Sequence, residues 1–127
     1  MTHRWLYDVP ESPLHPDVTA IAQALGYERL AFTSQRKAIA ELKRRPPSLI
    51  ISDFFYGYGN NYAGANVSNL DVLLHSVQRF APQARIIVCA DRQELPHTDK
   101  LSALFDLHAV IAMQANPDSI RQAFEDS

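Results

Sequence analysis

Short apolar runs alternate along this 127-residue chain with longer segments in which apolar residues recur every three or four positions. Runs rich in β-branched residues are typical of buried strands, and the longer period is typical of helices packed by one face. The runs predict strands at residues 5–7, 30–32, 49–53, 86–90 and 109–112. Helical spacing follows each run, at residues 18–25, 38–42, 70–80, 101–105 and 120–124. Five alternations of strand and helix predict one α/β domain, residues 1–127, with a mostly parallel sheet covered on both faces.

Turn and capping residues mark the ends of these elements. Prolines at 10, 13 and 16 exclude a helix between the first strand and Asp17. Gly26 is suited to end the first helix. Thr33 or Ser34 is expected to cap the second helix, and Ser68 or Asn69 the third. Asn116-Pro117-Asp118 is a strong start for the last helix, with a cap, a proline in the first turn and an acid beside it.

One segment, residues 54–66, fits neither period. It is dense in glycine, asparagine and aromatic residues, so a long loop is predicted. Loops of this length are more often functional than idle, and this composition suits an adaptable recognition surface. The candidate contact residues are Phe54, Phe55, Tyr56, Tyr58 and Tyr62. The alternative is that the two phenylalanines pack on the edge of the sheet and the tyrosines cover a pocket.

Composition narrows the classes of function. Hydrophobic residues make up 46 % of the chain, enough for a core, and the net charge of −2 argues against a general nucleic-acid surface. The basic run 43–45 is expected to be a solvated helix end. Cys89 is the only cysteine and lies in an apolar run, which predicts a buried, unreactive thiol in a reducing cytoplasm. No signal peptide or membrane-spanning segment is expected.

Asp53 is the leading candidate for chemistry. It closes the apolar run 49–52, and the carboxyl ends of parallel strands are where open α/β sheets place their sites. Asp8 closes the first strand in the same way, so the two carboxylates could hold a cation together. The alternative is a remnant pair that caps backbone or faces solvent. The histidines (His3, His15, His75, His97 and His108) are scattered without metal-ligand spacing, and no phosphate-binding loop or nucleophile elbow is present.

The chain resembles a response-regulator receiver domain of the CheY-like family. The resemblance runs from Arg4 to Ser127 and is best at residues 47–53, at 84–90 and in the closing helix. It implies a flavodoxin-like three-layer sandwich whose five-stranded parallel sheet has the order 2-1-3-4-5. In such domains the carboxylate at the position of Asp53 accepts a phosphoryl group. An acidic pair binds Mg²⁺, and a hydroxyl residue and a lysine contact the phosphoryl oxygens.

Matched position by position, the site is degenerate. Asp53 and Asp8 are kept, but the second acid falls on Val9 and the hydroxyl residue on Ala90. The lysine falls on Met113, or on Gln114 if the register slips by one, and the aromatic switch residue falls on Val110. Mg²⁺ favours carboxylate oxygens, so its binding by Asp8 and Asp53 would be weak unless Glu11 or Asp17 contributes.

Three functions follow from this comparison. The first is a non-catalytic pseudo-receiver in the cytoplasm that acts by protein–protein contact, as a homodimer or on a regulatory partner, without nucleic acid, membrane or cofactor. Its expected interfaces are the face formed by residues 101–124 and the aromatic loop. The second is an atypical receiver that is still phosphorylated on Asp53 with Mg²⁺. The third is a flavodoxin-like protein that binds a small ligand or nucleotide under the loop, or an enzyme.

Overall fold

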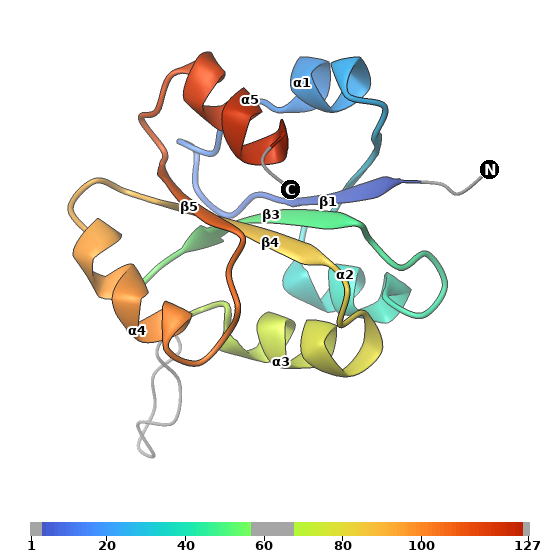
Figure 1. Ribbon diagram of the computed structural model, residues 1–127. Helices are drawn as coiled ribbons and strands as arrows, with labels where there is room; N and C mark the ends of the chain where they lie inside the picture. The colour runs from blue at the N-terminus through green and yellow to red at the C-terminus, as the bar shows by residue number, and fades with distance from the viewer. Residues whose placement is uncertain (1–3, 57–67, 126–127) are drawn as a thin grey trace.

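Five parallel strands form one sheet, and the computed structural model describes residues 4–56 and 68–125 of the chain (Figure 1). The sheet order is β2-β1-β3-β4-β5, which confirms the predicted topology. The strands are β1 (Trp5–Val9), β2 (Glu28–Ala31), β3 (Leu49–Phe54), β4 (Arg85–Ala90) and β5 (Ala109–Ala112). The helices are α1 (Thr19–Ala24), α2 (Gln35–Glu41), α3 (Asp71–Phe80), the 3₁₀ turn η1 (Leu95–His97), α4 (Thr98–Ser102) and α5 (Pro117–Glu125).

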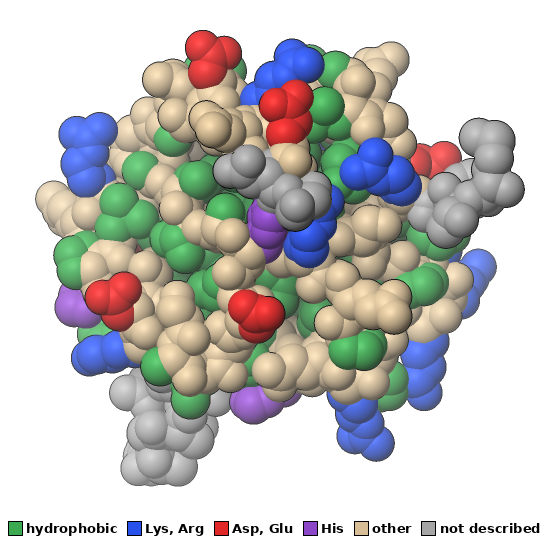
Figure 2. All heavy atoms as spheres, in the orientation of Figure 1, with side chains coloured by type: hydrophobic (Ala, Val, Ile, Leu, Met, Phe, Trp, Pro, Cys, Tyr) green, Lys and Arg blue, Asp and Glu red, His purple; other side chains and the backbone are tan. Residues whose placement is uncertain are grey.

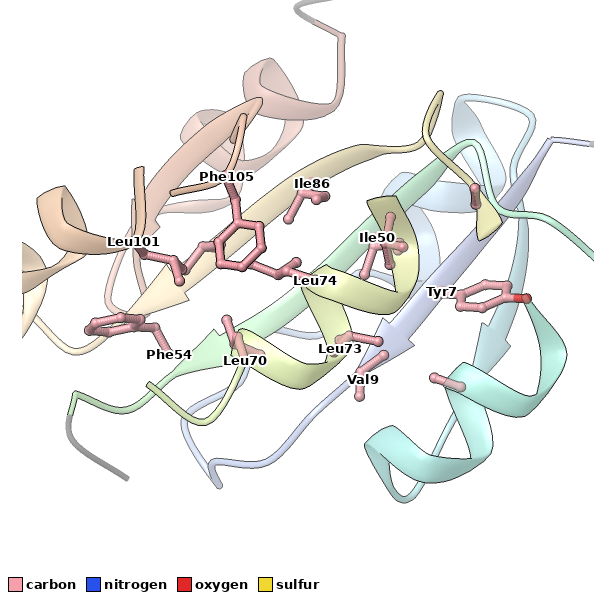
Figure 3. Packing of buried hydrophobic residues seen from close by; sticks show 14 of the residues in the cluster. Tyr7, Val9, Ile50, Phe54, Leu70, Leu73, Leu74, Ile86, Leu101 and Phe105 are labelled. Carbon is pink, nitrogen blue, oxygen red and sulfur yellow. The ribbon is translucent and has the colours of Figure 1, made fainter. Parts of the chain in front are cut away.

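Helices cover both faces of the sheet. Figure 1 shows α1 and α5 on one face and α2 and α3 on the other, with α4 beside them. Each face has its own apolar core, because successive side chains of a strand point to opposite sides. Figure 3 shows the larger core, where Leu73 of α3 lies beside Val9 of β1, and Tyr7 lies toward α2.

The predicted ends of the elements are partly correct. Ser34 caps α2 by accepting a hydrogen bond from the Lys37 backbone, and the side chain of Asn116 accepts one from Ser119 at the start of α5. The predicted cap of α3 is wrong: its first turn is instead held by Asp71, whose carboxylate accepts hydrogen bonds from the backbone N–H and the hydroxyl of Ser68. Gly26 follows α1 with a φ of 81°, the left-handed conformation that glycine adopts easily.

Two strands differ in extent from the prediction. β2 begins at Glu28, before the apolar run that was expected to form it, because its backbone pairs with β1 from Trp5 onward. β3 continues through Phe54, which is fully buried and belongs to the larger core. Phe54 is therefore a core residue and not part of an exposed recognition loop.

Candidate functional site

Asp8 and Asp53 meet at the carboxyl ends of β1 and β3, as the strand order requires. The pairing of Asp8 with Ile51 and of Val9 with Ser52 places the two carboxylates on adjacent strands. Asp8 lies two residues after Leu6, and Asp53 two residues after Ile51. Leu6 and Ile51 belong to the smaller core, so both carboxylates point to the face that carries α1 and α5. The relative exposure is 2 % for Asp8 and 0 % for Asp53. Two buried carboxylates this close need positive charge beside them.

His15 supplies that charge. Its Nε2 lies 2.6 Å from Oδ1 of Asp8, and its Nδ1 lies 2.7 Å from Oδ1 of Asp53. The side chain of His15 is only 6 % exposed. It comes from the proline-rich segment between β1 and α1, which crosses the carboxyl edge of the sheet and places the ring between the two carboxylates.

The geometry requires the protonated ring. A carboxylate oxygen only accepts hydrogen bonds, so both ring nitrogens of His15 must donate, which an imidazolium alone can do. Burial lowers the pKa of His15, but the hydrogen bonds and negative charges of Asp53 and Asp8 outweigh this effect and raise the pKa to about 9. His15 is therefore a fixed cation at neutral pH, bound on both sides.

Arg29 completes the balance of charge. Its Nε lies 2.7 Å from Oδ2 of Asp8, and its side chain is 35 % exposed, so it closes the cluster toward solvent. We call Asp8, His15, Arg29 and Asp53 the ion cluster. Its two carboxylates and two cations sum to no net charge, which is the condition under which buried charges are tolerated.

The second oxygen of Asp53 is also engaged. Its Oδ2 accepts hydrogen bonds from the backbone N–H groups of Glu11, at 2.8 Å, and Ser12, at 3.0 Å. The side chain of Asn69 donates to the backbone carbonyl of Asp53 at 2.7 Å, which ties the start of α3 to the same strand end. Each of the four carboxylate oxygens of Asp8 and Asp53 thus has a partner within the chain.

These residues do not fit a Mg²⁺ ion as they are arranged. Mg²⁺ requires oxygen ligands in near-ideal octahedral geometry, whereas here the oxygens that face each other are bridged by an imidazolium. Glu11, which could have contributed a third carboxylate, instead accepts hydrogen bonds from Gln35 and Asn69. No cluster of three or more potential metal ligands with suitable geometry occurs in the described parts of the chain.

The other positions matched to a receiver site are apolar and lie close by. Val9 and Ala90 are fully buried at the ends of β1 and β4, and Met113 is 7 % exposed just after β5. The backbone N–H of Met113 donates to the carbonyl of Ala90, so these two positions are neighbours. Val110 lies in β5, partly buried against the larger core. None of these four side chains can donate a hydrogen bond to a phosphoryl group.

The aromatic segment starts on the surface at Phe55 and Tyr56. Tyr56 is 41 % exposed and stacks on His97, with ring centroids 4.1 Å apart. Its hydroxyl accepts a hydrogen bond from Lys100 at 2.6 Å, and its backbone N–H donates to Glu94 at 2.6 Å. Tyr56 is thus bound to η1 and α4. Tyr58 and Tyr62, the other predicted contact residues, lie outside the described residues.

A hollow of about 520 Å³ lies beside the ion cluster. It is lined by Pro10, Glu11, Thr33 and Phe55. Burial raises the pKa of the Glu11 carboxyl, hydrogen bonds from Gln35 and Asn69 oppose this, and the charge of Asp53 adds to it. The hollow lies near the carboxyl ends of the strands, where the sequence predicts the pocket of a small-ligand protein, and Phe55 is the part of the aromatic segment that lines it.

His15 is the residue that sequence reasoning missed. No local pattern marks it, because its two partners lie 7 and 38 residues away in sequence and share no helix or strand with it. The available signal was its place in the segment directly after Asp8, which must cross the edge of the sheet where Asp53 ends. Cys89, in contrast, behaves as predicted: it is fully buried, and burial raises the pKa of its thiol.

Comparison with solved structures identifies the fold of the chain. The chain superposes on FixJ-N with a TM-score of 0.72 over 99 % of its length and 94 % of the other chain, at 14 % identity. A response-regulator receiver domain protein from Clostridium thermocellum gives a TM-score of 0.70 at 12 % identity, covering 96 % of this chain and 91 % of that one. The chain has the receiver fold. A CheY-like receiver domain protein from Methanospirillum hungatei JF-1 matches at 0.68, with 16 % identity over 98 % of this chain and 92 % of the other.

At 12–16 % identity, these neighbours show the fold of the chain and no more. No model of a protein family matches the sequence, and no curated protein matches it. No helix within residues 4–56 and 68–125 is long and apolar enough to cross a membrane.

Proposed function

We propose that this domain is a non-catalytic, receiver-like signalling module that acts by contact with another protein or a second copy of itself, independently of phosphorylation. The receiver fold supports the signalling role. Independence of phosphorylation is supported by one observation, the engagement of Asp53 by His15 and by two backbone N–H groups. The proposed setting is the cytoplasm, without a cofactor.

The reactivity of Asp53 would be suppressed by these contacts. A carboxylate oxygen that accepts a hydrogen bond from a cation is a weaker nucleophile, and such bonds are worth about 1.5–3 kcal/mol each. Breaking a buried ion pair costs about 3–5 kcal/mol. A transferred phosphoryl group would then add negative charge beside Met113 and Ala90, which offer neither a cation nor a hydroxyl.

The face formed by residues 101–124 is the proposed surface for contact between copies. It contains β5, an edge strand of the sheet, and Leu104, which is 54 % exposed. An exposed edge strand beside an exposed leucine is a common basis for pairing. Analytical ultracentrifugation of the wild type and of Leu104→Lys would test it, with weaker association expected for the variant.

Phosphoryl transfer is tested directly by incubating the protein with Mg²⁺ and acetyl phosphate and measuring its intact mass. We expect no acid-stable, hydroxylamine-sensitive adduct on the wild type and no response to beryllofluoride. Asp99→Asn, at an exposed carboxylate in the first turn of α4, is the matched control for Asp53→Asn. An adduct on the wild type and on Asp99→Asn that is absent from Asp53→Asn would overturn the proposal.

Ligand binding is a second candidate, favoured by the hollow between Pro10, Glu11, Thr33 and Phe55. Its volume lies within the range of small-molecule sites, about 300–1,000 Å³. A thermal-shift screen with nucleotides and flavins tests it, because a ligand that binds the native state alone raises the melting temperature. A large shift that is lost in Thr33→Trp, which would fill the hollow, would favour this function over the first.

A further inference from the structure

A second recess lies at the opposite end of the sheet from the ion cluster, at the amino-terminal ends of β1, β3 and β4. Its volume is about 780 Å³. We call it the basal groove, and its principal lining residues are Trp5, Pro46, Pro47, Phe80, Pro82 and Arg85. Two aromatic rings and three prolines make the lining mostly apolar and rigid, since proline side chains have no rotamers to order on binding.

Two cationic side chains lie beside the aromatic ring of Phe80 in this lining. The Nζ atom of Lys43 lies 4.6 Å from the centre of the Phe80 ring, and the guanidinium carbon of Arg79 lies 5.2 Å from it. Both side chains are exposed, and neither forms an ion pair within residues 4–56 and 68–125. The ring therefore holds two positive charges at the rim of the groove through cation–π contacts, without neutralising them.

The three segments that line and flank the groove contain basic residues and no acidic ones. Residues 4–5, 43–48 and 79–85 contain six of the twelve Lys and Arg residues of the chain and no Asp or Glu. Glu28 and Glu41 reach these segments from outside, Glu28 by accepting a hydrogen bond from Trp5 and Glu41 by pairing with Arg44 and Arg45. Figure 2 shows Lys and Arg side chains at the lower right of the molecule, where the ends of α2 and α3 lie in Figure 1.

This concentration of positive charge contrasts with the rest of the domain. The whole chain has a net charge of −2, so the basal end differs in sign from the remainder. A groove that is apolar inside and cationic at its rim complements a segment with an apolar side chain flanked by carboxylates. Nucleic acid is a poorer match to the groove. Proteins that bind a run of phosphates are normally positively charged over the whole domain, whereas here the positive charge is confined to one end.

We propose that the basal groove binds an acidic peptide segment of a partner protein. A large apolar side chain of the segment lies between Trp5 and Phe80, and its carboxylates pair with Lys43 and Arg79. The proposal deepens the proposed function and rests on it only in that the domain works by contact with another protein. The groove is remote from Asp53, so peptide binding and phosphoryl transfer can be tested separately.

Trp5 is the only tryptophan of the chain and lines the groove, so its fluorescence reports binding. The probe is a synthetic peptide of about twelve residues with Phe and Leu at its centre and Asp or Glu at most other positions. Its isosteric control has Asn and Gln at the acidic positions. We expect the acidic peptide to give a saturable change in Trp5 emission and to bind at least tenfold more tightly than the control, with an affinity that falls as salt is added.

Charge reversal locates the site. Lys43→Glu combined with Arg79→Glu should weaken binding of the acidic peptide at least tenfold. Arg36→Glu combined with Arg92→Glu, a matched pair of exposed cations outside the groove, should leave it within about twofold. Circular dichroism confirms that each variant is folded.

Three results would overturn the proposal: no fluorescence response to the acidic peptide, equal affinity for the acidic and isosteric peptides, or tighter binding of a single-stranded oligonucleotide of equal charge. Asp53→Asn should bind the peptide as the wild type does. If the wild type binds no acidic peptide and also forms no phosphoryl adduct on Asp53, the peptide site in the basal groove is refuted. The proposed function, independent of phosphorylation, then still stands.

Discussion

Replacing His15 by alanine should be among the most damaging single substitutions in this domain. The change removes the cation that lies 2.6 Å from Asp8 and 2.7 Å from Asp53, and it leaves Asp53 buried without a charged partner. Two charge-assisted hydrogen bonds are lost at about 1.5–3 kcal/mol each, and removing one partner of a buried ion pair costs about 3–5 kcal/mol. We expect a loss of about 3–5 kcal/mol in the free energy of unfolding.

Urea denaturation at pH 7, followed by Trp5 fluorescence and circular dichroism, measures this loss. A double-mutant cycle separates the charge from the packing of the ring. Asp53→Asn removes one negative charge while keeping the shape of the side chain, so His15→Ala should cost at least about 1 kcal/mol less in that background. His75→Ala is the control: His75 is exposed and makes an edge-on ring contact with Phe105, so a loss of about 1 kcal/mol or less is expected.

A loss below about 1 kcal/mol for His15→Ala, or strict additivity with Asp53→Asn, would refute the reasoning. Either result would mean that the imidazolium does not neutralise the carboxylates. The proposed suppression of Asp53 chemistry would then lose its physical basis.

Three further predictions concern stability. The pKa of His15 is raised from 6.5 to about 9 in the folded state, so its contribution is complete below pH 6.5 and is lost as the pH rises through 9. The difference in unfolding free energy between wild type and His15→Ala should therefore shrink by roughly 3 kcal/mol from pH 6 to pH 10, and a constant difference would contradict the assignment. Ser52 has a buried hydroxyl without a hydrogen-bond partner among the described residues, so Ser52→Ala should raise the free energy of unfolding by about 1 kcal/mol, whereas a loss would indicate a missed partner. Gly26→Ala should lower the melting temperature and cost about 1 kcal/mol, because alanine is strained at a φ of 81°. No atom lies within 4 Å of the added Cβ, so no steric clash adds to this cost. Gly26→Asn should cost less, since asparagine tolerates this conformation better.

The fold could be predicted because its signals are local and repeated. The runs that became β3 and β4 are continuous and apolar, as central parallel strands must be, and Ser34 and Asn116 carry the capping chemistry of their helices. β2 was harder to place, since it is an edge strand with exposed residues and little apolar signal. Its start is set by pairing with β1, which no local pattern records.

The candidate site could be located but not understood from the sequence. Asp8 and Asp53 were identified because each ends an apolar run at a known edge of the sheet. The role of His15 depends on the path of the proline-rich segment and on contacts across 38 residues, and neither leaves a periodic trace. Val9, Ala90 and Met113 indicate that the site lacks the second acid, the hydroxyl and the lysine of a receiver. They do not indicate that His15 and Arg29 neutralise the remaining carboxylates.

The segment between β1 and α1 is attached to Asp53 at two places, by the amides of Glu11 and Ser12 and by the ring of His15. Those two amides belong to a surface connection, yet they can open to solvent only when a buried carboxylate loses its partners. In hydrogen exchange they should be protected nearly as long as the central strands. This connection would then behave kinetically as part of the core, and the carboxyl edge of the sheet would be its rigid end.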